Sequence, residues 1–283
     1  MALHARRTRT RGAPRMSART FSFALDAPRP PQVGLVALQS DETVEPDLRR
    51  LLPETLDLLV TRVPSGAEVT AETLAAMEHH LAGAASLFPP GASFRAVGYA
   101  CTSGTAQIGR ERIAALVGDA CRTQAATEPV SALIAACGAL GVRRLALLSP
   151  YIAAVSERLR AVLAEAGIAT PLVGSFDVAE EARVARIGPD SIMGAARSLA
   201  ARGGADAIFL SCTNLRTLDV IAPLEAETTL PVLSSNLVLA WHMAELASSG
   251  LARGAPGCLA ALGREVIGVD RDRDVAESRS PTV

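Results

Sequence analysis

Two stretches of the chain, FRAVGYACTSG (94–104) and ADAIFLSCTNL (205–215), give the clearest indication of the fold. Each contains an apolar run typical of a buried strand, and each run ends in Cys-Thr followed by small or polar residues. The interval from Cys101 to Cys212 is the same as the interval between the strand starts at 33 and 144. The equal separation indicates an internal duplication in which strand 33–38 corresponds to strand 144–149.

Apolar runs and helical patterns alternate along the rest of the chain. Strands are expected at 33–38, 56–63, 94–101, 143–149, 173–178, 205–212 and 230–235, and helices at about 70–87, 130–140, 153–166, 191–202, 215–228 and 236–249. A short helix is expected after Thr43, and another after TSGT (102–105). This alternation predicts an α/β fold with parallel sheets covered by helices on both faces. Two such units would face each other across a cleft, which is where open parallel sheets bind ligands.

The domain boundaries follow from the same pattern. We expect a first domain from residues 32–129 plus 237–268 and a second from 130–236, with a disordered charged tail at 269–283. The segment 1–31 holds seven arginines and one acid. It fits a disordered arm, a transit peptide or an over-extended start with the true one at Met16.

Composition excludes several classes of function. All 28 basic residues of the 283-residue chain are arginine, so a Schiff-base lysine and a P-loop are both impossible. A formal net charge of -1 gives no reason to expect nucleic acid as a partner. Uncharged stretches such as 96–109 and 129–142 are too short to span a membrane, which takes about 20 residues. The five cysteines form no CxxC pair, which favours the reducing cytoplasm.

The repeated Cys-Thr motifs are the strongest candidates for chemistry. We expect each cysteine to lie where a parallel strand gives way to a helix, whose N–H groups and dipole favour the thiolate. The nearby Thr102, Ser103, Thr213 and Asn214 would bind a substrate carboxylate. Two opposed thiols suit proton removal from one face of a carbon and delivery to the other, or addition to a double bond. The alternative is that each is a small buried hydrophobe.

Other strand exits add candidates for binding. Tyr151 follows strand 143–149, and Asn236 follows strand 230–235; Asn214 and Asn236 are the only asparagines, for which helix capping is the competing interpretation. No metal or dinucleotide motif is present, and pairs such as His242 and Glu245 are weak signals for metal. We therefore expect neither a metal nor an organic cofactor.

The stretches YACTSGTAQIG, LSCTNLRT and PVLSSNLVLAWH together resemble the Asp/Glu racemase superfamily, in particular the branch with maleate cis-trans isomerase, arylmalonate decarboxylase and the ectoine-utilisation racemase-like protein. The opening GLVALQSDETVEPDLRRLLP looks most like the last group. The resemblance spans roughly residues 32–262. It implies two flavodoxin-like domains related by pseudo-twofold symmetry, with a cofactor-independent active site in the cleft between them.

The resemblance also implies roles for individual residues. Cys101 matches the attacking thiolate of the isomerase, Cys212 the assisting cysteine, and Tyr151 a tyrosine that contacts a substrate carboxylate. Positions matching Thr102, Ser103 and Thr213 hold carboxylates. The decarboxylase keeps only the second cysteine, so the presence of both favours isomerisation or racemisation over decarboxylation.

One loop departs from the isomerase pattern. Where maleate isomerases carry an asparagine, this chain reads Ser40-Asp41-Glu42-Thr43. An acid there would repel the second carboxylate of maleate and pair with an ammonium group, although the two acids would equally suit capping of the following helix.

We therefore expect an isomerase or racemase acting on an amino acid or an acylated diamino acid, as in ectoine degradation. The alternatives are a maleate isomerase, an arylmalonate-type decarboxylase and a non-catalytic ligand sensor. The expected protein is a cytoplasmic homo-oligomer that binds a small carboxylate and neither nucleic acid nor membrane.

Overall fold

The computed structural model describes residues 20–25 and 29–262, and it contains two four-stranded parallel sheets. The first has the order β2-β1-β3-β4, with β1 (Gln32–Leu38), β2 (Asp57–Val63), β3 (Phe94–Ala100) and β4 (Ala126–Thr127). The second has the order β6-β5-β7-β8, with β5 (Arg144–Ser149), β6 (Ala169–Ser175), β7 (Ala207–Leu210) and β8 (Val232–Ser234). The two orders repeat each other, which confirms the predicted pair of parallel-sheet α/β units.

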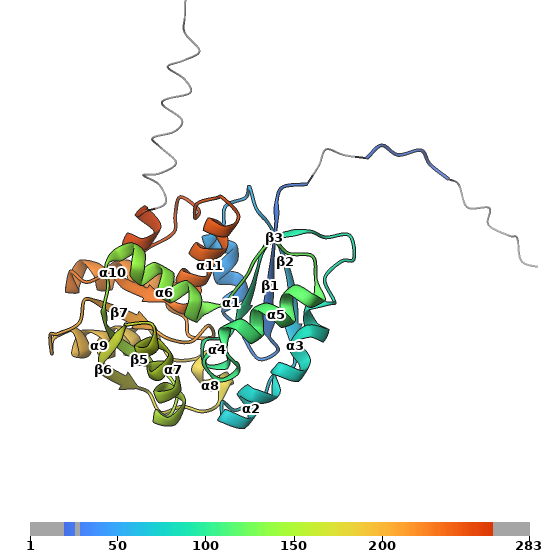
Figure 1. The fold of residues 1–283 in the computed structure, drawn as a ribbon. Coiled ribbons are helices and arrows are strands. Elements are labelled where there is room, and N and C mark those ends of the chain that lie inside the picture. Colours follow the sequence, from blue (N-terminus) through green and yellow to red (C-terminus); the bar gives the residue numbers. More distant parts are fainter. Residues whose placement is uncertain (1–19, 26–28, 263–283) are drawn as a thin grey trace, which may run out of the picture.

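Helices connect the strands and cover both sheets (Figure 1). In chain order they are α1 (Val44–Leu51), α2 (Ala71–Ala76), α3 (Glu78–Ala85), α4 (Thr102–Ile108), α5 (Arg110–Ala120), α6 (Pro129–Leu140), α7 (Ala153–Glu165), α8 (Glu181–Val184), α9 (Pro189–Ala200), α10 (Leu218–Thr228) and α11 (Ser235–Leu246). The sequence predicts a single helix where α4 and α5 lie, and it predicts neither α8 nor the short strand β4.

The central strands β1, β3, β5 and β7 are almost wholly buried, because helices lie on both sides of each sheet. The two halves meet where α4 packs on α7 and where α11 packs on α6. Helix α11 contacts β3 of the first sheet as well as β8 of the second. The division into 32–129 plus 237–268 and 130–236 stays a prediction.

Two further predicted elements differ from the structure. The expected helix 70–87 is broken at Met77 into α2 and α3. The strand expected at 173–178 instead runs from Ala169 to Ser175 and includes Pro171. A proline is tolerated there because β6 lies at the edge of its sheet, and the register shifts beside it.

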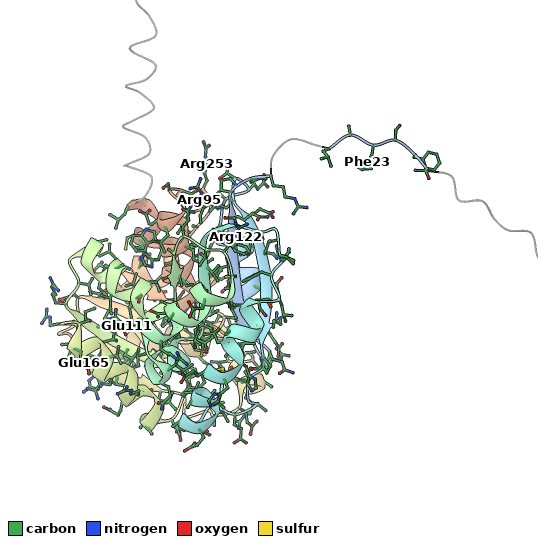
Figure 2. All side chains as sticks on the ribbon, turned by 45° about the vertical axis from the view of Figure 1, so that its right-hand side comes forward. Phe23, Arg95, Glu111, Arg122, Glu165 and Arg253 are labelled. Atoms are coloured by element: carbon green, nitrogen blue, oxygen red, sulfur yellow. The ribbon has the colours of Figure 1, made fainter. Side chains whose placement is uncertain are left out.

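The ends of the chain fall largely outside the described residues. Of the predicted arm at 1–31, residues 1–19 and 26–28 are not described, nor is any of the predicted tail at 269–283. Residues 20–25 form neither helix nor strand, and Phe23 lies 86% exposed on a segment that extends away from the body (Figure 2). Within the described ranges, every helix is too short or too polar to cross a membrane.

Candidate active site

The predicted site residues come together at the carboxyl ends of the strands, where the two halves are fastened to each other. The Thr102 hydroxyl lies 2.7 Å from the Ser235 hydroxyl, and Ser235 also accepts the backbone N–H of Cys212 at 3.0 Å. The Thr213 hydroxyl donates to the carbonyl of Ala100 at 3.2 Å. Each Cys-Thr motif is thus positioned by the other, directly or through Ser235.

Cys101 caps the first turn of α4. Its Sγ accepts the backbone N–H of Gly104 at 3.1 Å. A Cβ at position 104 would lie 2.9 Å from that sulfur and 2.7 Å from the Tyr99 hydroxyl, so only glycine allows this approach. Burial raises the pKa of Cys101 to about 12, opposed by the Gly104 N–H and reinforced by the negative charge of Glu181.

Cys212 is held differently, and the prediction that it begins a helix is wrong. After Cys212 the chain makes a turn, and α10 begins only at Leu218. Cys212 adopts φ 113°, a conformation that costs a non-glycine residue about 1–3 kcal/mol and that clusters at functional sites. Its Sγ accepts the Asn214 N–H at 3.3 Å and lies 2.9 Å from the Tyr151 hydroxyl.

Glu181 is the main residue that the sequence prediction missed. Its side chain is 4% exposed and accepts the Tyr151 hydroxyl at 2.8 Å and the Asn214 amide at 2.8 Å. Because Tyr151 has one proton and gives it to Glu181, the Cys212 thiol is left to donate to the Tyr151 oxygen. The result is a hydrogen-bonded chain from Cys212 through Tyr151 to Glu181.

The backbone around Glu181 is anchored on the first half of the molecule. The Glu181 N–H donates to the carbonyl of Ala67 at 3.1 Å, and the Val69 N–H donates to the carbonyl of Ala179 at 2.9 Å. Burial raises the pKa of Glu181, opposed by the hydrogen bonds from Asn214 and Tyr151. Glu181 therefore reaches the site by a contact between the two halves that no local sequence motif encodes.

Asp41 has two oxygens in different situations. One, Oδ1, accepts the backbone N–H groups of Thr43 and Val44 at 2.8 Å each, so the capping interpretation holds for it. The other, Oδ2, is buried with no hydrogen-bond partner among the described residues. Burial raises the pKa of Asp41. The neighbouring Glu42 side chain is instead about half exposed and pairs with Arg186 at 2.8 Å.

The remaining predicted residues have mixed placements. The Asn214 side-chain oxygen accepts the Glu42 backbone N–H at 2.9 Å. The Asn236 amide donates to Asp47 and to the Thr213 carbonyl, so in this arrangement it supports the Cys212 loop and makes no hydrogen bond to either thiol. Ser103 lines a cavity next to the start of α4.

That cavity has a volume of about 250 Å³ and lies between α2, α4 and the start of α7. Its wall includes Ser103, which lies two residues after Cys101 in the sequence, and Ile152, which directly follows Tyr151. Most of the lining surface is apolar. Besides Ser103, its polar side chains are Thr70, Glu72, Gln107 and Arg158.

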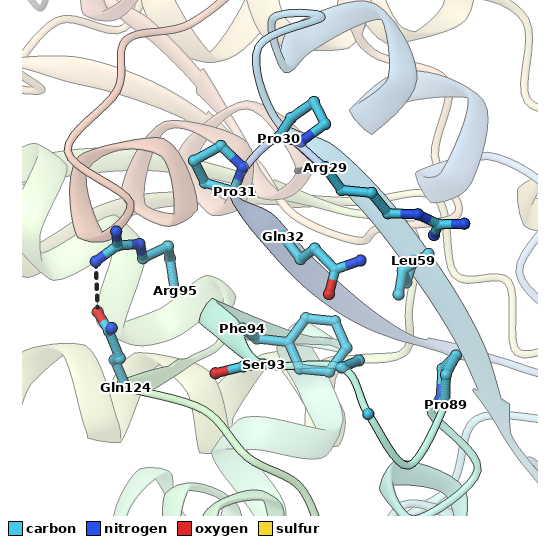
Figure 3. Close-up of a pocket in the computed structure, with 12 residues that line it drawn as sticks. Arg29, Pro30, Pro31, Gln32, Leu59, Pro89, Ser93, Phe94, Arg95 and Gln124 are labelled. Carbon is cyan, nitrogen blue, oxygen red and sulfur yellow. Dashed lines mark hydrogen bonds between the residues drawn. The ribbon is translucent and has the colours of Figure 1, made fainter. Parts of the chain in front are cut away.

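A cavity of about 650 Å³ lies elsewhere, at the amino ends of β1 and β3, beside Gln32 and Phe94 (Figure 3). Figure 3 shows Arg95 and Gln124 joined by a hydrogen bond at its edge. Because Cys101 follows the carboxyl end of β3, this cavity is at the opposite end of the sheet from the thiols.

The site has an uneven charge balance. Across residues 20–25 and 29–262, no arginine or histidine forms an ion pair with Asp41 or Glu181. Arg62 is the basic residue whose charge lowers the pKa of Asp41, and it donates to the Asp41 backbone carbonyl at 2.8 Å. Its guanidinium group also pairs with Glu45. Over the same described ranges, no group of three or more acidic, cysteine or histidine side chains is arranged to hold a metal ion.

Parts of this chain are similar in sequence to known proteins. Residues 112–260 match the family model for arylmalonate decarboxylase. The chain is 38% identical over 120 residues to arylmalonate decarboxylase from Bordetella bronchiseptica, covering 42% of this chain and 50% of the relative. It is 32% identical over 105 residues to maleate isomerase from Nocardia farcinica, covering 37% and 41%. The matched parts thus span half or less of these curated relatives.

Solved structures extend the likeness over most of the chain. A maleate isomerase from Pseudomonas putida superposes with a TM-score of 0.73 at 26% identity, covering 82% of this chain and 98% of that one. A variant of the maleate cis-trans isomerase from Nocardia farcinica, with a covalently bound succinylcysteine intermediate, superposes with a TM-score of 0.70 at 26% identity, covering 81% and 98%.

Proposed function

This chain belongs to the arylmalonate decarboxylase family, and we propose that within it the protein is a cofactor-independent two-cysteine isomerase or racemase of a small carboxylate. The observation that carries the proposal is the pair of buried thiols, Cys101 and Cys212, held at equivalent strand ends and fastened together through Ser235. A protein that only binds its ligand has no need of a thiol from each half.

In the proposed reaction, the thiolate of one cysteine removes the proton from a carbon next to the carboxylate. The thiol of the other donates a proton to the opposite face, so one proton leaves and one arrives. Thr102, Ser103 and Thr213 would hold the carboxylate, with the N–H groups at the start of α4. The chain Cys212–Tyr151–Glu181 gives the second thiol a route by which its proton can move to a carboxylate.

For the substrate, we propose an amino acid or an acylated diamino acid, as in ectoine degradation. Support comes from Asp41, whose unpaired Oδ2 would suit an ammonium group. The cavity of about 250 Å³ beside Ser103 would take the acyl chain.

Decarboxylation is the second candidate, because the family model and the 38% identical relative are arylmalonate decarboxylases. Both reactions pass through a carbanion-like state that a thiol reprotonates. They differ in whether a proton or carbon dioxide leaves the carbon. An arylmalonate carries two carboxylates, and the acids of this site make it the less favoured substrate.

The test is a panel of amino acids, acylated diaminobutyrate, maleate and phenylmalonate, incubated with the protein in deuterium oxide and followed by proton NMR. Racemisation predicts deuterium at the α-carbon of an amino substrate and loss of optical activity. Fumarate from maleate, or carbon dioxide from phenylmalonate, would instead establish one of the other reactions. A sensor would leave every compound unlabelled.

A further inference from the structure

We propose that Glu181 and Asp41 together form a recognition site for a positively charged group, so that the substrate carries one carboxylate and one cationic group. The inference rests on the proposed function and narrows its substrate. It assigns Glu181, which neither the sequence motifs nor the family comparison singled out, as a specificity-determining residue.

Glu181 already occupies the donors that would otherwise receive a carboxylate from the substrate. The Tyr151 hydroxyl and the Asn214 amide each donate to one of its two oxygens, both at 2.8 Å. A second carboxylate brought in by a ligand would find these donors engaged and would meet a like charge. The chain therefore provides a built-in carboxylate, and a ligand of the opposite charge is its complement.

Asp41 provides the independent observation that a ligand is missing. The side chain is 4% exposed, and its Oδ2 has no hydrogen-bond partner in the described part of the chain. The nearby Thr213 hydroxyl lowers the pKa of Asp41 but donates its proton to the carbonyl of Ala100. A buried acceptor without a donor destabilises the folded protein.

Asp41 and Glu181 are joined through Asn214, whose amide donates to Glu181 at 2.8 Å and whose oxygen accepts the backbone N–H of Glu42, the residue after Asp41, at 2.9 Å. The negative charge of Asp41 also raises the pKa of Glu181 and of both thiols. A donor bound between Asp41 and Glu181 would satisfy the free oxygen.

The charge balance identifies that donor as a cation. Two acids and two thiols converge, and no arginine or histidine forms an ion pair with either acid within the described ranges. The negative charges of Glu181 and Asp41 oppose ionisation of both thiols. A bound cation would offset those charges, and hence a cationic substrate would assist the formation of the thiolate that acts on it.

The experiment compares two probes that differ only in the ammonium group: Nγ-acetyl-2,4-diaminobutyrate and 4-acetamidobutyrate. Isothermal titration of the full chain gives the dissociation constants, and interconversion of enantiomers does not disturb it because enantiomers have equal enthalpy. Glu181→Gln and Asp41→Asn each remove one charge, and Asn keeps the capping acceptor at position 41. Glu180→Gln, which alters the exposed acid next in the chain, is the matched control.

The wild-type protein and Glu180→Gln should bind the amino probe at least about 30-fold more tightly than its partner, because a buried charge pair is lost without the ammonium group. Glu181→Gln and Asp41→Asn should each weaken binding of the amino probe about 10-fold or more and leave that of 4-acetamidobutyrate unchanged or improved. Circular dichroism and thermal unfolding establish that each variant is folded.

Three results would overturn the inference. The first is equal binding of the two probes by the wild-type protein, which includes no measurable binding of either. The second is an amino-probe affinity that neither Glu181→Gln nor Asp41→Asn changes, even if kcat falls, since Glu181 would then serve only to relay protons. The third is tighter binding of maleate than of the amino probe.

These measurements separate the recognition site from the proposed function. Binding that depends on the two acids, without any deuterium exchange, would uphold the recognition site and reject the isomerase. Turnover of maleate that is independent of Glu181 would uphold an isomerase and reject the recognition site.

Discussion

The two Cys-Thr motifs share their sequence and their position in a repeated sheet, yet they hold their thiols in different ways. Cys101 caps a helix, in an extended conformation, and its sulfur accepts the N–H of Gly104. Cys212 has a positive φ, begins a turn, and is hydrogen-bonded to Tyr151. The two thiols thus share their place at the end of a strand and differ in their surroundings.

The two thiols therefore depend on different neighbouring groups for their position. In the first half, Gly104 lets the helix N–H approach the sulfur of Cys101. At the equivalent position of the second half stands the buried Leu215, and Asn214 is drawn to Glu181. The first thiol is therefore governed by a helix end and the second by a polar network that both halves build.

The largest expected effect comes from removing either thiol. Cys101→Ala and Cys212→Ala should each lower kcat by about 10²–10⁴-fold, the usual contribution of a positioned general acid or base. Cys121→Ala, which changes a partly buried thiol at the end of α5, should leave kcat unchanged. Steady-state rates with a substrate from the NMR panel make the comparison, and full activity in either of the first two variants would refute a two-thiol mechanism.

A smaller effect is expected where the two halves are joined. Ser235→Ala removes the acceptor for the Cys212 N–H and the partner of Thr102, which should lower the free energy of unfolding by about 1–3 kcal/mol and also lower kcat. Ser234→Ala removes only the cap of α11 and should cost about 1 kcal/mol with kcat unchanged.

Urea unfolding and steady-state rates distinguish the two serine variants. If both lowered kcat equally, the link through Ser235 would have no specific role in placing the thiols.

The smallest effect concerns the pH dependence of the two thiols. Burial raises the pKa of Cys212, and Tyr151 lowers it by donating a hydrogen bond to the thiolate once a proton has passed from the thiol through Tyr151 to Glu181. Tyr151→Phe removes the lowering contribution, so the pKa rises further and the thiolate forms only at higher pH. Tyr99→Phe should do the same for Cys101, because Tyr99 lowers the pKa of that thiol.

The check is kcat, measured at saturating concentration from each enantiomer across pH. The alkaline limb should move to higher pH in one direction of reaction for Tyr151→Phe and in the other direction for Tyr99→Phe. A shift in the same direction of reaction for both variants would contradict the assignment of one thiol to each face.

Much of the fold and part of the site could be predicted from the sequence. The equal separation of the two cysteines and of the two strand starts pairs the strands correctly, because buried parallel strands are read from apolar runs. Tyr151 is expected from its strand exit to lie near the thiols, and its hydroxyl is 2.9 Å from Cys212. These successes depend on local patterns at strand ends.

The rest depends on contacts between distant segments. Glu181 lies after an edge strand in a segment anchored by Ala67, and no local motif distinguishes it from the neighbouring Glu180. Ser235 lies in the stretch PVLSSNLVLAWH, but its link to Thr102 and Cys212 exists only after both halves have folded. The helix expected near 215–228 begins only at Leu218, after a turn in which the Asn214 amide donates to the distant Glu181.

In the proposed mechanism, Cys101 and Cys212 act on opposite faces of one carbon. The most direct test measures deuterium exchange at the α-carbon separately for each pure enantiomer, in Cys101→Ser and in Cys212→Ser. We expect a mirror-image result, in which each variant loses exchange chiefly from a different enantiomer. Loss of exchange from the same enantiomer in both variants, or from neither, would contradict it.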